Sequence, residues 1–201
     1  MKFDRIRNNL ERRGYQVSCF ETAAQAAEYL NAQIDCRTVG IGGSVTIDQM
    51  GLYDMLCTHN DVAWHWRVPP GDTAMQVLER ERRASVYLSS VNAMSRSGEI
   101  VNIDGNGNRV SDINFGHSCV YLIIGSNKIE QNLERAIYRA RNVAAPKNAQ
   151  RLGARTPCAL KGNRCYNCSS SDRICKTINV LLEKPRLCAY EIILIDEELG
   201  Y

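Results

Sequence analysis

The sequence predicts an α/β protein with a mostly parallel β-sheet covered by helices on both faces. The first observation is that helical and strand periodicities alternate along most of the chain, which is the pattern of repeated β-α-β units. The second is the length of 201 residues, which corresponds to one domain at about 150 residues per domain. We therefore treat residues 1–201 as a single domain that contains a cysteine-rich segment at residues 157–175.

The first half of the chain alternates regularly between the two patterns. Thr46 with Gln49, and Thr73 with Gln76, have the spacing of capping boxes, so each pair is expected to begin a helix. Helices are expected over residues 2–13, 21–33, from 46 onward and 73–83. Strands are expected over residues 15–20, 38–41, 62–66 and 85–88.

The second half has a different rhythm. Asn106 and Gly107 favour a type I′ turn, which predicts a hairpin between residues 99–104 and 109–110. Asn127, with Glu130 as its partner, is expected to cap a long helix that runs to about residue 143 and is stopped by Pro146. Strands are expected over residues 119–124 and 186–195.

The charge balance is weak overall and uneven along the chain. Basic side chains exceed acidic ones by 25 − 22 = 3, which is low for a nucleic-acid-binding protein. Residues 128–164 hold nine basic and two acidic side chains, which favours a small anionic substrate or a partner's cofactor, although a solvated helix face would explain the same charges. No apolar run has the length of a membrane span, and the charged amino terminus does not resemble a signal peptide, so we expect a cytoplasmic protein.

A glycine-rich loop follows the strand expected at residues 38–41. In the stretch GIGGSVT, Gly42 and Gly43 allow a tight turn and a close approach of the backbone to a ligand. Ser44 and Thr46 add hydroxyl groups at the start of a helix, where unpaired N–H groups favour a phosphate or a carboxylate. These four residues are the candidate cofactor-binding site, although a tight strand-to-helix turn would need the same glycines.

The stretch SGEIVNIDGNGNRV, residues 97–110, is denser in polar groups than a hairpin requires. A hairpin tip at the carboxyl edge of the sheet would deliver Asp104 or Arg109 to a cavity, and Glu99 is a second carboxylate in the stretch. Asp104, Glu99 and Arg109 are therefore the candidate catalytic residues. Further polar candidates are His65, Arg67 and His117.

Four of the nine cysteines lie in one segment rich in glycine, asparagine and serine. Cys158, Cys165, Cys168 and Cys175 have the spacing C-x6-C-x2-C-x6-C, which suits the ligands of a single metal centre. An iron–sulfur cluster of the 4Fe–4S type is favoured over zinc, and a thiol or disulfide switch is the third interpretation. The remaining five are interpreted as buried small hydrophobic residues: Cys19, Cys36, Cys57, Cys119 and Cys188.

Three motifs, in this order, resemble the LUD domain family of lactate utilisation proteins: GIGGSVTIDQMGLYD, VNAMSRSGEIVNIDGNGNRV and CYNCSSSDRIC. The resemblance covers nearly the whole chain, and the cysteine motif is characteristic of one branch of the family. It implies a fold similar to the ribose-5-phosphate isomerase, glucosamine-6-phosphate deaminase and CoA-transferase superfamily, with ligands at the carboxyl ends of the strands. It also implies a link to the oxidation of L-lactate to pyruvate, together with iron–sulfur partner proteins.

Three functions remain open on this basis. The first is a redox accessory of 2-hydroxy-acid oxidation, in which the cysteines hold an iron–sulfur cluster. The second is a binding or regulatory module with a structural zinc site. The third is an isomerase or transferase that acts on a sugar phosphate or an acyl-CoA, with Asp104 or Glu99 as base or nucleophile. Whether the chain is an enzyme by itself, and whether it forms a homo-oligomer, also stays open.

Overall fold

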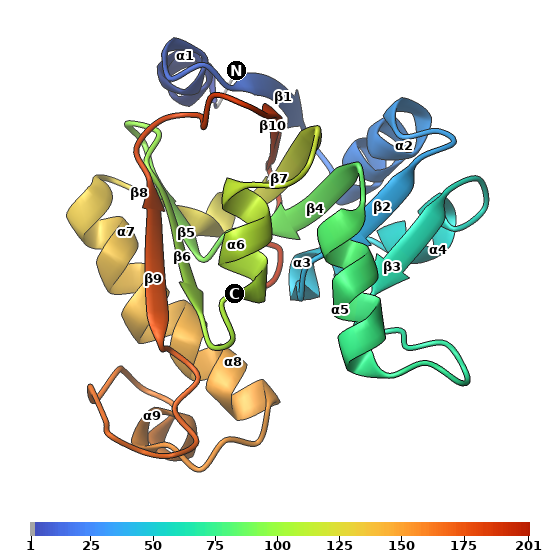
Figure 1. The fold of residues 1–201 in the computed structure, drawn as a ribbon. Helices are drawn as coiled ribbons and strands as arrows, with labels where there is room; N and C mark the ends of the chain where they lie inside the picture. Colours follow the sequence, from blue (N-terminus) through green and yellow to red (C-terminus); the bar gives the residue numbers. More distant parts are fainter. Residues whose placement is uncertain (1–2) are drawn as a thin grey trace.

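A computed structural model describes residues 3–201, and its main feature is a six-stranded parallel sheet. Every neighbouring pair of strands in this sheet is parallel. Across the sheet the strands are β1 (Gln16–Phe20), β10 (Ala189–Ile195), β7 (Cys119–Gly125), β4 (Val86–Ser90), β2 (Thr38–Ile41) and β3 (Asp61–Trp64) (Figure 1). The sheet confirms the predicted α/β class.

Helices cover both faces of this sheet. They are α1 (Asp4–Arg12), α2 (Ala23–Gln33), α3 (Val45–Gln49), α4 (Leu52–Leu56), α5 (Ala74–Arg83) and α6 (Asn108–Asn114). On β7, Val120, Leu122 and Ile124 belong to a core with α1 and α6, whereas Tyr121 and Ile123 belong to a core with α2, α3 and α4. Because successive strand residues point to opposite faces, each face of the sheet has its own helical layer, as predicted.

The two predicted capping boxes have different outcomes. Thr73 caps α5, and its backbone N–H donates in return to the Gln76 side chain at 2.8 Å, which confirms the prediction. Thr46 lies inside α3, because Ser44 is extended and caps that helix by accepting a hydrogen bond from Ile47 N at 3.2 Å. The prediction for Thr46 and Gln49 is therefore wrong, and the Thr46 hydroxyl is free for another partner.

A second sheet of four strands, which the sequence does not predict, lies beside the first. Its strands are β8 (Ile129–Glu130), β5 (Ala93–Ser95), β6 (Ile100–Asp104) and β9 (Thr177–Leu181). Its hairpin joins β5 to β6, so the hairpin predicted around Asn106 and Gly107 is wrong. Asp104 Oδ1 accepts hydrogen bonds from the N–H groups of Asn106 and Gly107, both at 3.1 Å, and Gly107 has a φ of +85°. This geometry turns the chain into α6 instead of back along β6.

The long basic helix begins later and ends later than predicted. Its parts are α7 (Leu133–Arg139), a π-helical turn (Ala140–Ala144) and α8 (Ala145–Arg151). Asn132 caps α7, whereas Asn127 lies in a short 3-10 turn, so the cap predicted at Asn127 is wrong. Pro146 does not stop the helix, because the wide π-helical turn places it in the first turn of α8, where a missing N–H is tolerated.

The cysteine-rich segment follows α8 and lies at one end of the molecule (Figure 1). It begins with α9 (Pro157–Lys161), which packs against α8, and is irregular from there to β9. The strand predicted from residue 186 begins at residue 189 as β10. Within residues 3–201, no helix combines the length and the apolar character needed to cross a membrane.

Candidate functional site

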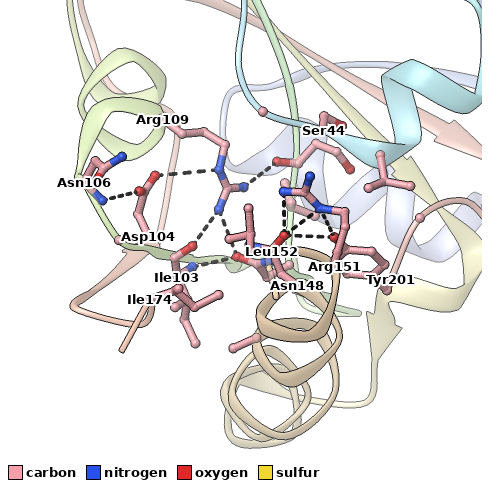
Figure 2. Close-up of a pocket in the computed structure, with 18 of the residues that line it drawn as sticks. Ser44, Ile103, Asp104, Asn106, Arg109, Asn148, Arg151, Leu152, Ile174 and Tyr201 are labelled. Carbon is pink, nitrogen blue, oxygen red and sulfur yellow. Dashed lines mark hydrogen bonds and ion pairs between the residues drawn. The ribbon is translucent and has the colours of Figure 1, made fainter. Parts of the chain in front are cut away.

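A cavity of about 440 Å³, with several charged side chains in its lining, opens at the carboxyl ends of the parallel strands. Residues that follow β2, β3, β4 and β7 line one side, and α8 and the end of the cysteine segment line the other. The close-up in Figure 2 shows side chains from three of these elements around the cavity: Ser44 after β2, Arg151 on α8 and Ile174 at the end of the cysteine segment. Its charged lining consists of Asp104, Arg109, Lys128, Arg151, Arg173 and Lys176, besides His65. Five basic side chains against one carboxylate favour an anionic ligand.

The glycine-rich loop forms one wall of this cavity through Gly43, Ser44 and Thr46. A Cβ atom on Gly42 would lie 2.4 Å from the Tyr87 hydroxyl, so no other residue fits there without a shift. A Cβ atom on Gly43 would lie 3.3 Å from Nε2 of His65. The glycine-rich loop thus lies between β2 and α3, and at Gly42 the close approach is made to Tyr87 of β4.

Lys128 lies on the floor of the cavity and is 3% exposed. Its Nζ donates to Thr46 Oγ1 and to Ser90 Oγ, both at 2.8 Å. Burial, followed by the positive charges of Arg139 and Arg109, lowers the pKa of Lys128 to about 7. No carboxylate of residues 3–201 forms an ion pair with this amine.

Arg109 holds the two sheets together at the cavity. Its guanidinium donates to Ser90 O at 3.2 Å and Asn92 Oδ1 at 3.2 Å after β4, and to Asn102 Oδ1 at 2.9 Å and Ile103 O at 2.6 Å on β6. With this many protein acceptors, Arg109 positions the cavity wall more than it offers a free donor to a ligand. Figure 2 shows the Arg109 guanidinium bonded to Ile103 and facing Asp104.

Asp104 lines the cavity beside Arg109, with 3.7 Å between its Oδ2 and the arginine Nε. Its Oδ1 is engaged by the turn into α6, and its buried Oδ2 has no hydrogen-bond partner among the described residues. Of the two predicted carboxylates, Asp104 is therefore the one that the structure places at the cavity.

Glu99 lies elsewhere, at the start of β6. It accepts hydrogen bonds from the Ser95 and Ser97 hydroxyls and from Arg13 Nη2 at 2.6 Å. Burial raises the pKa of Glu99, but these hydrogen bonds outweigh it and hold the pKa below its ordinary value. The structure thus separates Glu99 from Asp104 and Arg109 and gives it a role in fastening the β5–β6 hairpin.

Of the three further polar candidates, only His65 reaches the cavity. Its Nδ1 lies 2.8 Å from Oε1 of Glu81, which is fully buried and also accepts from the His65 backbone N–H at 2.5 Å. Burial raises the pKa of Glu81. Arg67 forms an exposed ion pair with Asp48 at 2.9 Å, and His117 is buried against the Tyr87 ring.

The four clustered cysteines are partly exposed free thiols. Among residues 3–201, no three His, Cys, Asp or Glu side chains are arranged to hold a metal ion, so the structure does not bring these sulfurs together. Asn167, with a φ of +46°, donates its N–H to Cys165 Sγ at 3.3 Å. Arg173 donates to the carbonyls of Cys168 and Cys175 at 2.8 and 2.9 Å, and itself lines the cavity. The segment and the cavity therefore share a wall.

The five scattered cysteines only partly match their prediction. Cys188 is buried, and Cys19 and Cys119 are partly buried. Cys36 and Cys57 are exposed, so the interpretation of these two as buried hydrophobic residues is wrong. Both lie in turns at the end of helices α2 and α4, where the apolar neighbours in the sequence point into the core and the thiols do not.

The chain is an α/β protein with a parallel sheet, and its cavity lies at the carboxyl ends of the strands, where open α/β sheets usually bind their ligands. The family model of the LUD domain matches residues 3–195, and the chain belongs to this family. Membership supports a role related to lactate utilisation. No curated protein sequence matches the chain.

One solved structure to which the chain is similar is that of a DUF162 family protein from Deinococcus radiodurans. The TM-score is 0.53 at 15% sequence identity, and the alignment covers 95% of this chain and 94% of that one. At this level of identity the comparison shows a shared fold.

Sequence reasoning missed Lys128 and Glu81. Lys128 follows an apolar run at residues 119–124, and a lysine directly after a buried central strand was the available signal. Glu81 gave no such signal, because it belongs to the charged stretch ERERR, whose other four residues are exposed.

Proposed function

We propose that this chain binds a small carboxylate of 2-hydroxy-acid metabolism, such as L-lactate or pyruvate, and acts as a redox accessory of lactate oxidation. The observation that carries the proposal is Lys128, a buried amine at the floor of a basic cavity without a carboxylate partner among residues 3–201. Membership of the LUD family supports the choice of carboxylate.

The physical reason is the cost of an uncompensated buried charge. A protonated Lys128 in this position would cost several kcal/mol unless a counter-charge is present. A bound carboxylate supplies that charge and accepts the N–H that Thr46 and Ser90 leave unused. Arg151 and Lys176 line the same cavity and extend its positive field.

Calorimetric titration tests this proposal. L-lactate and pyruvate are expected to bind, and Lys128→Met should weaken binding at least tenfold because it removes about 1.4 kcal/mol or more of charge-assisted hydrogen bonding. Lys147→Met, an exposed lysine on α8, is the matched control and should bind as the parent does. Binding of ribose 5-phosphate in place of either acid would instead favour the sugar-phosphate isomerase function.

We further propose that Cys158, Cys165, Cys168 and Cys175 hold a 4Fe–4S cluster. The residue types fit, because all four ligands would be free thiols from one irregular segment. Their sulfurs are not gathered in this structure, so binding of the cluster would have to gather them. The Asn167 N–H already points at Cys165 Sγ, as stabilisation of a thiolate requires. Such a cluster supplies one-electron transfer. Arg141 Nη2, 3.9 Å from Cys165 Sγ, would offset its negative charge.

Anaerobic purification followed by metal and sulfide analysis tests the cluster. Iron and acid-labile sulfide with a brown colour are expected, and Cys168→Ser should lower the iron content. Colourless protein with one zinc per chain would replace the cluster with a structural zinc site. Protein that takes up neither metal after anaerobic reconstitution would leave the cysteines as a thiol switch and end the redox proposal.

A further inference from the structure

The amine of Lys128 is arranged as a nucleophile, which anion binding alone does not require. Thr46 donates its hydroxyl hydrogen to Leu199 O at 3.3 Å, and Ser90 donates its own to Ile123 O at 2.6 Å. Each hydroxyl oxygen can therefore only accept from Lys128 Nζ. An uncharged amine has two N–H bonds and one lone pair, so these contacts use both hydrogens and leave the lone pair for a ligand.

We propose that Lys128 forms an imine with the carbonyl group of a 2-oxo acid bound in the cavity. The proposal rests on the proposed binding of a 2-hydroxy or 2-oxo acid and deepens it by naming the 2-oxo acid as the reactive form. The nitrogen lone pair attacks the carbonyl carbon, and a C–N bond forms as the C=O π bond breaks. The two amine hydrogens then leave with the carbonyl oxygen as water, which yields C=N without any oxidant or reductant.

Three properties of the site support this chemistry. Burial keeps water from the amine and, with Arg139 and Arg109, lowers the pKa of Lys128, so a large fraction is uncharged at neutral pH. No carboxylate within residues 3–201 forms an ion pair that would keep the unliganded amine protonated. The 2-oxo acid reacts with the uncharged form of Lys128 when its own carboxylate lies against Arg151 or Lys176, which line the same cavity, instead of against Lys128. His65 lines the same cavity, with its Nδ1 bonded to Glu81 and its Nε2 available to exchange protons with the leaving oxygen.

The other lysines provide an internal comparison. Lys147, Lys161 and Lys176 are exposed to solvent and lack the burial that activates the amine of Lys128. If the imine forms on Lys128 in preference to these residues, its formation depends on the cavity and not on the general reactivity of lysine.

Reductive trapping on the wild-type protein tests the proposal. The protein is incubated with pyruvate and sodium cyanoborohydride at neutral pH, digested, and analysed by peptide mass spectrometry. We expect a carboxyethyl group on Lys128 at a yield at least tenfold above that on Lys147. L-lactate has no carbonyl group and should give no adduct.

Calorimetric binding of pyruvate, measured in parallel, separates this proposal from the preceding one. Trapping at Lys128 supports both. Pyruvate binding with no adduct, or with adducts spread evenly over the lysines, would overturn the imine and keep the carboxylate site. Absence of binding and of adduct would overturn both.

Ser90→Ala gives a second readout that does not remove the amine. The variant loses one of the two acceptors that orient Lys128 Nζ, so the rate of trapping should fall several-fold more than the affinity for pyruvate. Lys147→Met should leave both unchanged. An equal fall in trapping and affinity for Ser90→Ala would indicate a merely structural role for Ser90 and count against the oriented amine.

Discussion

The Lys128 cavity and the cysteine segment share a wall but are built differently. In the cavity, Lys128, Thr46 and Ser90 are buried, bonded to one another and attached to the ends of regular strands. In the segment, all four cysteines are partly exposed, and the chain between α9 and β9 is irregular. The cavity is therefore organised before any ligand binds, whereas the segment has few buried apolar contacts to hold one arrangement of its sulfurs.

This difference shows what keeps the cavity and the cysteine segment in a defined conformation. Buried, mutually bonded polar groups keep their geometry because breaking it would leave unsatisfied donors and acceptors. A segment of half-exposed thiols gains its order from the ligand, since metal binding and folding are coupled in such segments. Substitutions in the cavity should therefore lower the free energy of unfolding whether or not a ligand is bound. Substitutions in the cysteine segment should lower it mainly when the metal is bound.

The largest difference in stability between the two regions is expected when one hydrogen-bonded arginine is replaced in each of them. Arg109→Leu leaves buried acceptors of both sheets without a donor, and should lower the free energy of unfolding by about 3 kcal/mol or more. Arg173→Leu removes bonds to the carbonyls of two partly exposed residues, Cys168 and Cys175, and should lower the free energy of unfolding by about 1 kcal/mol or less. Urea unfolding followed by circular dichroism measures both; equal losses would contradict the proposed difference.

Patterns that depend on the nearest neighbours in the chain predicted most of this fold. The strands from residues 38–41 and 119–124 and the cap at Thr73 follow from local apolar runs and local side-chain bonds. The second sheet could not be predicted in this way, because β6 pairs with β9 across more than 70 residues, and neither strand reveals its partner. The π-helical turn before Pro146 could not be predicted either, because a proline by itself predicts the end of the helix.

The sequence predicted which loops form the candidate site, but it did not predict the buried lysine at its floor. Gly43, Ser44 and Asp104 reach the cavity as expected because they follow strands of the sheets at the same edge. Lys128 was missed because its importance comes from burial and from hydroxyl groups at residues 46 and 90, which are distant in sequence. Glu99 was predicted to be catalytic because it lies in the same polar stretch as Asp104. In the structure it is bonded to Ser95, Ser97 and Arg13 and fastens the β5–β6 hairpin away from the cavity.

A change of one pH unit is expected to have an effect of intermediate size, and this effect is specific to the cavity. Lys128 has a pKa of about 7 when folded and an ordinary pKa of about 10.4 when unfolded, so between these values the unfolded chain binds more protons. The free energy of unfolding, compared with that of Lys128→Met, should therefore rise with pH across this window by at most about 1.4 kcal/mol per pH unit. Lys147→Met should follow the wild type, and a flat difference between wild type and Lys128→Met would mean that Lys128 keeps its proton.

The smallest effect is expected from one thiol of the segment in metal-free protein. Cys168→Ala removes a partly exposed side chain, and should change the free energy of unfolding by about 0.5 kcal/mol or less, as should the control Cys57→Ala at the exposed end of α4. After anaerobic reconstitution with iron and sulfide, the wild type and Cys57→Ala should melt at a higher temperature, because a ligand that binds only the folded chain stabilises it. The melting temperature of Cys168→Ala should rise little, since a cluster held by three thiolates instead of four binds more weakly.

Two outcomes would contradict this prediction. An equal rise in melting temperature for both variants would show that metal binds away from the segment. A large loss of stability for Cys168→Ala without metal would show that the segment is organised by its own packing, as the cavity is.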